Sequence, residues 1–210
     1  MKKKIFSIAI ILIIFIFGSV LYLNKKIEQQ KDPYNVSTVL DDKGVKLYRQ
    51  GFRLLEEQLA TYIKEHYVGV SEIKFSPIFL QGGDSHSLFS AEITLSIKDN
   101  GNNEAYLSSR VGNMIYATYG DTYDLRMDFN GFDEEIIEII GDNGNYIDVT
   151  KNQKLPPQAK LTSNDKIDEN IEALIQNQQL KRVYKDQKGS SDAKVIYNDK
   201  IKKGDAREWR

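Results

Sequence analysis

The chain contains no cysteine and only two histidines, and these shortages limit the chemistry that it can perform. Without cysteine it has no disulfide, no cysteine-linked lipid anchor and no thiolate zinc ligand. His66 and His86 lie far apart in the sequence, so a zinc site is not expected, and no other metal or cofactor is predicted. The glycines between Gly112 and Gly120 lack the spacing of a phosphate-binding loop.

The chain also lacks an excess of basic residues. It has 29 Lys and Arg against 30 Asp and Glu. Without Lys2, Lys3 and Lys4 the remainder carries 26 basic and 30 acidic residues, a net charge of −4. Nucleic acids and anionic membrane surfaces attract basic proteins. The composition therefore predicts no nucleic-acid partner.

No catalytic residue is predicted, and we do not expect an enzyme. Residues 84–86 read Asp-Ser-His, but the members of a catalytic triad come together from distant segments. His66 falls in register with the apolar face of a predicted helix, which favours a packing role. The segments 99–104 and 142–145 are rich in Asn and Asp but lack the ligand spacing of an EF-hand loop, and hairpin turns explain them more simply.

The longest hydrophobic run lies at the N-terminus. Nineteen residues, 5–23, carry no charge, which is close to the length of a helix that crosses a bilayer. A cleaved secretory signal usually has a shorter apolar centre and a small-residue cleavage site, whereas this run continues past Gly18 and Ser19. We expect residues 1–24 to form a transmembrane anchor that contacts the lipid bilayer through residues 5–23. A processed signal peptide is the alternative.

The charges that flank this run predict its orientation. Lys2, Lys3 and Lys4 precede it, and acidic residues partly offset the lysines that follow it. Because basic flanks stay in the cytoplasm, we expect a single-pass protein of the cell membrane with a cytoplasmic N-terminus and an extracellular C-terminal domain. Residues 25–40 are polar and without periodicity, which is typical of a tether. The cleaved-signal alternative would also export the rest of the chain.

Residues 41–200 are predicted to form one extracytoplasmic α+β domain, followed by a flexible charged tail at 201–210. An amphipathic helix is expected to begin at Asp41 or Asp42 and to end before Gly69. Its apolar face has spacings of three and four. The residues of this face are Tyr48, Phe52, Leu55, Leu59, Tyr62, Ile63 and His66.

An antiparallel β-sheet, a meander, is expected to pack on this helix. In the segment 87–98, apolar and polar residues alternate from Phe89 onward, as in a strand with one buried face. Neighbouring strands are expected at 70–80 and 104–111, and Gly- and Asn-rich turns at 82–84 and 99–103 separate the three. Antiparallel sheets of this kind commonly expose one face to water.

The meander is expected to continue through residues 122–129, which alternate in the same way. Residues 133–140 fit either a short helix or a strand, and the Asn-Gly turn at 142–145 favours the strand. A second, C-terminal helix is predicted after Pro157, running to about Arg182. Its start is expected at one of three capping residues, Ser163, Asn164 or Asp165. A short edge strand is expected at 193–197.

Tyrosines and charged residues near the strand at 122–129 form the candidate binding surface. Its members are Tyr116, Tyr119, Asp121, Tyr123, Asp124, Arg126 and Asp128. Tyrosine and arginine are common anchors of protein interfaces. A solvated strand face without a function is the simpler alternative, and two carboxylates on one strand would also suit a glycan hydrolase.

Taken together, an apolar anchor, a polar tether, and a helix leading into an antiparallel sheet resemble the membrane-tethered immunity proteins of Gram-positive type VII secretion systems, notably the TipC family. The resemblance covers Met1 to Phe129. It implies a cognate secreted protein toxin as partner, neutralised when a sheet face with Asp124, Arg126 and Asp128 occludes its active surface. Two other functions stay open: wall-glycan hydrolysis in the cell envelope, and an accessory subunit of a secretion or conjugation apparatus.

Overall fold

The computed structural model describes most of the chain from Asp32 onward. The described residues are 18–24, 32–83, 88–108, 110–111, 114–115, 118–121, 123–130 and 134–210. Residues 18–24 are helical and belong to a compact unit at 1–35, separate from the unit at 36–210. Within the described ranges, no helix is both long enough and apolar enough to cross a bilayer. Most of the expected anchor, residues 5–17, and His86 lie outside these ranges.

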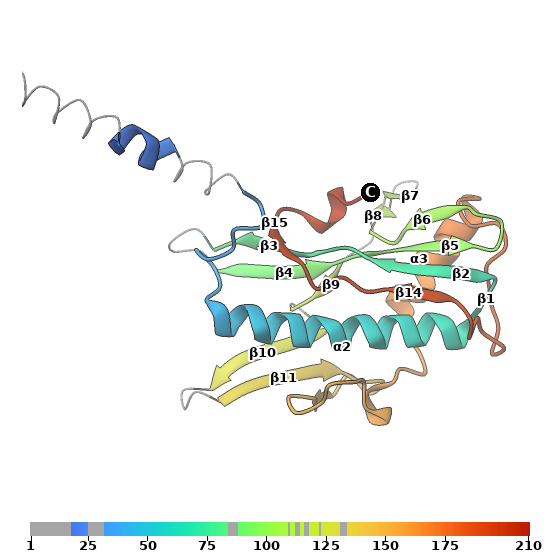
Figure 1. Ribbon diagram of the computed structural model, residues 1–210. Helices are drawn as coiled ribbons and strands as arrows, with labels where there is room; N and C mark the ends of the chain where they lie inside the picture. Colours follow the sequence, from blue (N-terminus) through green and yellow to red (C-terminus); the bar gives the residue numbers. More distant parts are fainter. Residues whose placement is uncertain are drawn as a thin grey trace, which may run out of the picture. The chain divides into compact units, whose positions relative to one another are not determined.

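The unit at 36–210 has an α+β fold, as expected from the sequence (Figure 1). The helices are α2 (Asp42–His66), η1 (Pro157–Ala159), α3 (Asp165–Gln176) and η2 (Ala206–Glu208). The strands of the first half are β1 (Tyr67–Val68), β2 (Val70–Phe75), β3 (Ile78–Gly82), β4 (Phe89–Ile93), β5 (Leu95–Asp99), β6 (Glu104–Tyr106), β7 (Arg110–Val111), β8 (Met114–Ile115) and β9 (Tyr119–Gly120). Those of the second half are β10 (Leu125–Asn130), β11 (Glu134–Ile140), β12 (Tyr146–Asp148), β13 (Tyr184–Lys185), β14 (Lys194–Ile196) and β15 (Ile201–Lys203).

Helix α2 is the central element of the core, and its predicted start is confirmed. The Asp41 side chain accepts a hydrogen bond from the backbone N–H of Gly44 at 2.7 Å, which satisfies a donor of the first turn. The predicted apolar face is buried, with Phe52 at 0% exposure. His66 ends the helix half-buried, with its ring stacked on Tyr62 at 4.3 Å between centroids, which supports a packing role.

The largest β-structure consists of two four-stranded ladders, ordered β14-β2-β5-β6 and β15-β3-β4-β9. The sequence predicts one unbroken strand over 87–98, but the structure divides it at Thr94, opposite Ser76 and Pro77. Proline cannot donate to a ladder, so pairing must change there. Ser76 donates its N–H to the Thr94 carbonyl at 2.9 Å, and its Oγ accepts the Thr94 N–H at 3.0 Å. These two hydrogen bonds keep the neighbouring strands connected where the ladder is interrupted.

The C-terminal segment makes this β-structure mixed instead of purely antiparallel. Strand β14 confirms the expected edge strand, but it pairs in parallel with β2, and β15 pairs in parallel with β3. The expectation of a flexible tail at 201–210 is wrong, because Ile201 and Ala206 are buried. Trp209 lies against Tyr106, with the ring centroids 5.4 Å apart.

A separate three-stranded sheet, ordered β10-β11-β12, packs on another side of α2, contrary to the single meander expected (Figure 1). Residues 134–140 form a strand, and Gly144 supplies the positive φ of the turn that follows. The contact with α2 is close at Gly51. A Cβ atom there would lie only 2.7 Å from Met127 Sδ, so only glycine fits without movement of the sheet residues.

Helix α3 begins where the sequence predicts and ends earlier. The Asn164 side chain accepts the Ile167 N–H at 2.9 Å and is the N-cap. The helix stops at Gln176 instead of Arg182, and Gln178 takes a left-handed conformation with φ of 59°.

At the other end of the unit, Val36, which the sequence assigns to the tether, is buried in the core.

Candidate functional site

Three of the seven candidate interface residues have structural roles. Tyr119 is completely buried in β9. The Asp121 carboxylate accepts the Ala91 N–H at 2.9 Å, and burial raises the pKa of this carboxyl to about 6. Asp124 accepts the Gly120 N–H at 2.9 Å and forms an ion pair with Lys166, whose Nζ lies 3.1 Å from the carboxylate. A fourth candidate, Tyr116, lies outside the described residues.

The other three candidates are exposed at the β10–β12 sheet. Tyr123 is 72% exposed and lies just before β10, instead of inside the strand as the sequence predicts. Arg126 and Asp128 are exposed on β10, because Leu125 and Met127 alternate with them and face α2.

Cross-strand register adds residues that the sequence does not reveal. Glu138 on β11 lies opposite Arg126 on β10 and opposite Asp148 on β12. Residues directly opposite each other in neighbouring strands project from the same face of a sheet. The solvent side of this sheet, which we call the open face, therefore includes Arg126, Asp128, Glu138, Tyr146 and Asp148, with Tyr123 at its edge. The half-buried Ile136 and Ile140 lie on the same face, opposite Asp128 and Tyr146.

The open face carries a fixed aromatic and cationic pair. The Arg126 guanidinium carbon lies 3.6 Å from the centre of the Tyr146 ring, within range of a cation–π contact. The Tyr146 hydroxyl donates to the Tyr123 carbonyl at 2.8 Å, which limits rotation of the ring. Three carboxylates, of Asp128, Glu138 and Asp148, share this face with one guanidinium. The arrangement suits recognition of a predominantly basic surface.

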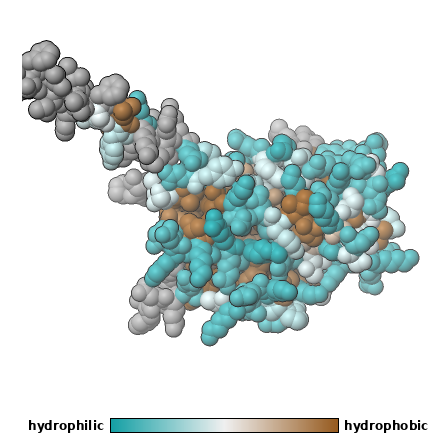
Figure 2. Space-filling view, viewed as in Figure 1, coloured by the Kyte–Doolittle hydropathy of each residue, from teal (hydrophilic) through white to brown (hydrophobic). Residues whose placement is uncertain are grey.

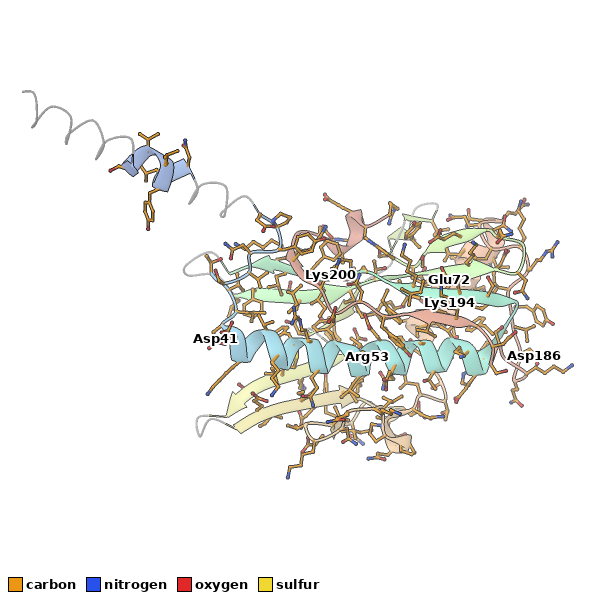
Figure 3. The ribbon with its side chains drawn as sticks, viewed as in Figure 1. Asp41, Arg53, Glu72, Asp186, Lys194 and Lys200 are labelled. Carbon is orange, nitrogen blue, oxygen red and sulfur yellow. The ribbon has the colours of Figure 1, made fainter. Side chains whose placement is uncertain are left out.

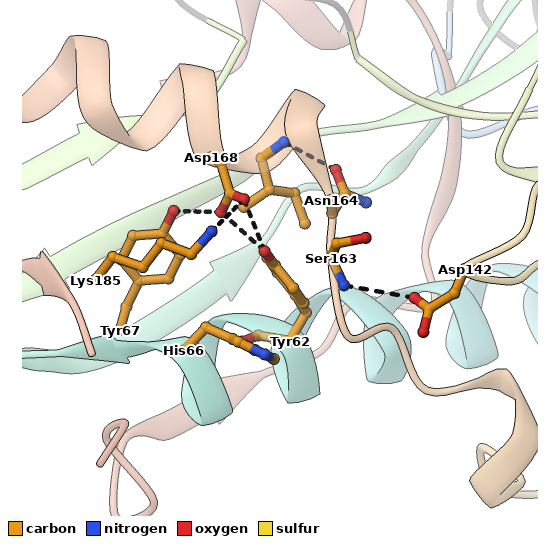
Figure 4. A network of polar contacts seen from close by, with 9 residues as sticks. Tyr62, His66, Tyr67, Asp142, Ser163, Asn164, Asp168 and Lys185 are labelled. Carbon is orange, nitrogen blue, oxygen red and sulfur yellow. Dashed lines mark hydrogen bonds and ion pairs between the residues drawn. The ribbon is translucent and has the colours of Figure 1, made fainter. Parts of the chain in front are cut away.

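A second polar cluster joins α2, α3 and the β1–β13 pair (Figure 4). The Asp168 carboxylate accepts hydrogen bonds from the Tyr62 hydroxyl at 2.8 Å and the Tyr67 hydroxyl at 2.5 Å, and from Lys185 Nζ at 2.6 Å. Burial alone would raise the pKa of Asp168, but these three bonds hold it below its usual range. The Asp168 carboxylate therefore has a structural role, because it links α2, α3, β1 and β13. The sequence contains no local signal for these contacts.

Hydrogen bonds in and around the Asn-rich turn at 99–103 explain the composition of this turn. The buried Asp99 carboxylate accepts the N–H groups of Gly101 at 2.7 Å, Asn103 at 2.9 Å and Lys181 at 3.0 Å. The side-chain amide of Asn103 donates to the same carboxylate at 2.8 Å. Despite burial, this bond and the backbone bonds lower the pKa of Asp99 to about 2. Across the described ranges, no group of three or more His, Cys, Asp or Glu is placed to hold a metal ion.

Comparison of the chain with protein-family models, with curated proteins and with solved structures gave no match. The chain is therefore classified by its fold alone, as an α+β protein in which α2 packs against two separate β-structures. Inferences about its function rest on its own surfaces.

Proposed function

We propose that this chain is a membrane-anchored extracytoplasmic binding protein that acts as an immunity protein. In this proposal it binds a cognate secreted antibacterial toxin and occludes the toxin's active surface. The open face is the observation that carries the proposal. It supplies a solvent-exposed charged surface with a preorganised Arg126–Tyr146 pair, and arginine and tyrosine are frequent hot-spot residues.

The sequence at the N-terminus supports the location in this proposal. Residues 5–23 carry no charge and are preceded by three lysines, a pattern typical of an anchor with a cytoplasmic N-terminus. An anchored inhibitor would meet a toxin at the outer surface of the membrane. In this hypothesis the anchor keeps the domain at the membrane, and the open face of the folded domain binds the toxin there.

The acidic character of the open face favours binding of a toxin whose active surface is basic. Opposite charges speed the association of two proteins, and this effect weakens as salt screens them. A standard interface covers roughly 800 Å² on each partner, so further residues around the open face must also take part. Occlusion of that area needs a rigid surface and no catalytic group.

The test is expression of toxins encoded by neighbouring genes in the periplasm of a sensitive host, with and without the exported full-length chain. The proposal expects the host to survive one of these toxins only when the chain is present, and expects that toxin to copurify with it. A host that dies in every case, with no toxin copurified, would contradict the proposal.

A further inference from the structure

A groove on a different surface lies between α2 and β14. It has a volume of about 450 Å³. Its lining includes Ala60 and Lys64 of α2, Lys160 after η1, Lys188, and Val195 and Tyr197 from β14 and the residues after it. We call it the lysine groove. Its volume lies in the range of roughly 300–1,000 Å³ that ligand sites occupy, which is enough for a few residues of a peptide.

The charge of the lysine groove is opposite to that of the chain as a whole. Its three lysines are accompanied by one acid, Glu65, which forms an ion pair with Lys160 at 2.8 Å. Lys64 and Lys188 form no ion pair with any described residue. Two uncompensated ammonium groups on a chain with a net charge of −1 select for an anionic ligand.

The apolar part of the groove is built on a fixed aromatic ring. The Tyr197 ring stacks on Phe75 at 6.0 Å with an interplanar angle of 2°. The guanidinium carbon of Arg53 lies 3.2 Å from its centroid. Figure 3 labels Arg53 on α2 and Lys194 on β14, the elements that border the groove. Figure 2 shows this side of the molecule as mainly hydrophilic with separate hydrophobic patches. Tyr197 is still 37% exposed, so the part of it that Arg53 and Phe75 leave uncovered can contact an apolar side chain with little loss of entropy.

Strand β14 also provides a backbone edge. It pairs with β2 on one side and is an end strand of its ladder in the described part of the chain. An extended peptide can bind such an edge by adding a strand, with backbone hydrogen bonds for affinity and alternate side chains for specificity. An edge of this kind favours a peptide over a small anion.

We propose that the lysine groove binds an acidic peptide segment in an extended conformation, with carboxylates at Lys64 and Lys188 and an apolar side chain against Val195 and Tyr197. The groove shares no residue with the open face. The proposal is therefore independent of the proposed immunity function, and each can fail without the other.

The probe is a fluorescein-labelled peptide in which Asp alternates with Val and Leu, and the reference peptide has Asn in place of Asp. Fluorescence anisotropy is measured on the full-length protein in a non-ionic detergent. We expect saturable binding of the acidic peptide, and binding weaker by about tenfold for the reference peptide and for the Lys64→Gln/Lys188→Gln double variant. Amide hydrogen exchange in β14 should slow when the acidic peptide is bound.

The matched control is the Lys43→Gln/Lys46→Gln variant, which has the same charge change at exposed positions near the start of α2. It should bind the acidic peptide as the unchanged protein does. The proposal is overturned if neither peptide binds, if both bind equally, or if the control variant loses as much affinity as the groove variant. Unchanged exchange in β14 would contradict strand addition.

Discussion

The two β-structures that contact α2 differ in how their outer faces are used. On the ladder β14-β2-β5-β6, Lys194 forms a cross-strand ion pair with Glu72 at 3.1 Å (Figure 3). Trp209 also packs on Tyr106 of this ladder. On the β10–β12 sheet, the carboxylates of the open face form no ion pair with any described residue. Of these carboxylates, only Asp148 is hydrogen-bonded within the described part of the chain, through the N–H and hydroxyl of Thr150. The second surface therefore has charge available for a partner at Asp128 and Glu138.

The difference separates residues that stabilise the fold from residues that can change without loss of stability. Charges satisfied by buried N–H donors or close ion pairs should matter to folding, because their removal leaves donors unsatisfied. Exposed charges on the open face should matter little to folding, because water already solvates them. Substitutions in the two regions should therefore give opposite patterns of stability and binding.

The largest loss of stability is expected for Asp99→Ala at the β5–β6 turn. The substitution leaves the N–H groups of Gly101, Asn103 and Lys181 without their acceptor. We expect a loss of about 3–5 kcal/mol in the free energy of unfolding, measured by denaturant titration. Asp99→Asn keeps an acceptor oxygen and should lose less.

The same carboxylate predicts an acid-sensitive transition. The pKa of Asp99 is about 2 in the fold, below its ordinary value of 3.8, so the folded state favours the charged form. Its contribution is present above pH 3.8 and declines as the pH falls toward 2. An Asp99→Asn variant that loses stability with acid as steeply as the unchanged protein would contradict this assignment.

The next-largest expected effect is a gain in the free energy of unfolding from a substitution at Glu56. This buried carboxyl of α2 accepts the Asn198 N–H at 3.2 Å. Burial raises its pKa from 4.5 to about 8, so folding favours the protonated form and stability falls as the pH rises between these values. Glu56→Gln should therefore stabilise the protein by a few kcal/mol at about pH 9 and change little at about pH 4. A stabilisation that does not depend on pH would contradict this cause.

A smaller loss is expected where α2 meets the β10–β12 sheet. In Gly51→Leu the new side chain would clash with Met127 and Leu125, and the expected loss is about 1–3 kcal/mol. Gly51→Ala is the matched variant, because its helix propensity gain of about 1 kcal/mol offsets part of the strain. Thermal unfolding that ranks alanine below leucine would show that the contact is looser than the structure indicates.

The smallest effect on stability is expected for Arg126→Ala on the open face. The side chain is exposed, so the change in the free energy of unfolding should stay within about 0.5 kcal/mol. A loss comparable to that of Asp99→Ala would remove the distinction between the two regions. Denaturant titration of both variants under the same conditions gives the comparison.

The sequence predicts the elements of this fold better than their arrangement. The period of α2 and its Asp41 cap are local signals, and so are the Asn-Gly turns. The division into two β-structures depends on which distant strands pair, and local alternation contains no such information. The parallel pairing of β14 and β15 is hidden for the same reason, and the charged composition of 201–210 conceals the two buried residues Ile201 and Ala206.

The candidate interface was predictable in part. Alternation alone places Arg126 and Asp128 on the exposed side of a strand. Glu138 and Asp148 join them only through the register of β11, and the sequence leaves residues 133–140 open between helix and strand. Tyr119 was misleading because the burial of a tyrosine depends on tertiary packing. The lysine groove has no sequence signal, since its lysines come from separate segments.

The most direct test of the account is survival of a sensitive host that expresses in its periplasm the toxin found in the test above. The unchanged protein is compared with a variant in which two charges of the open face are exchanged, Arg126→Glu with Asp128→Lys. The matched variant carries Glu72→Lys and Lys194→Glu on the other β-structure, with membrane levels equalised by immunoblot. The account predicts that the open-face variant fails to protect and that the matched variant protects as the unchanged protein does. Equal protection by both variants would contradict a role of the open face in binding.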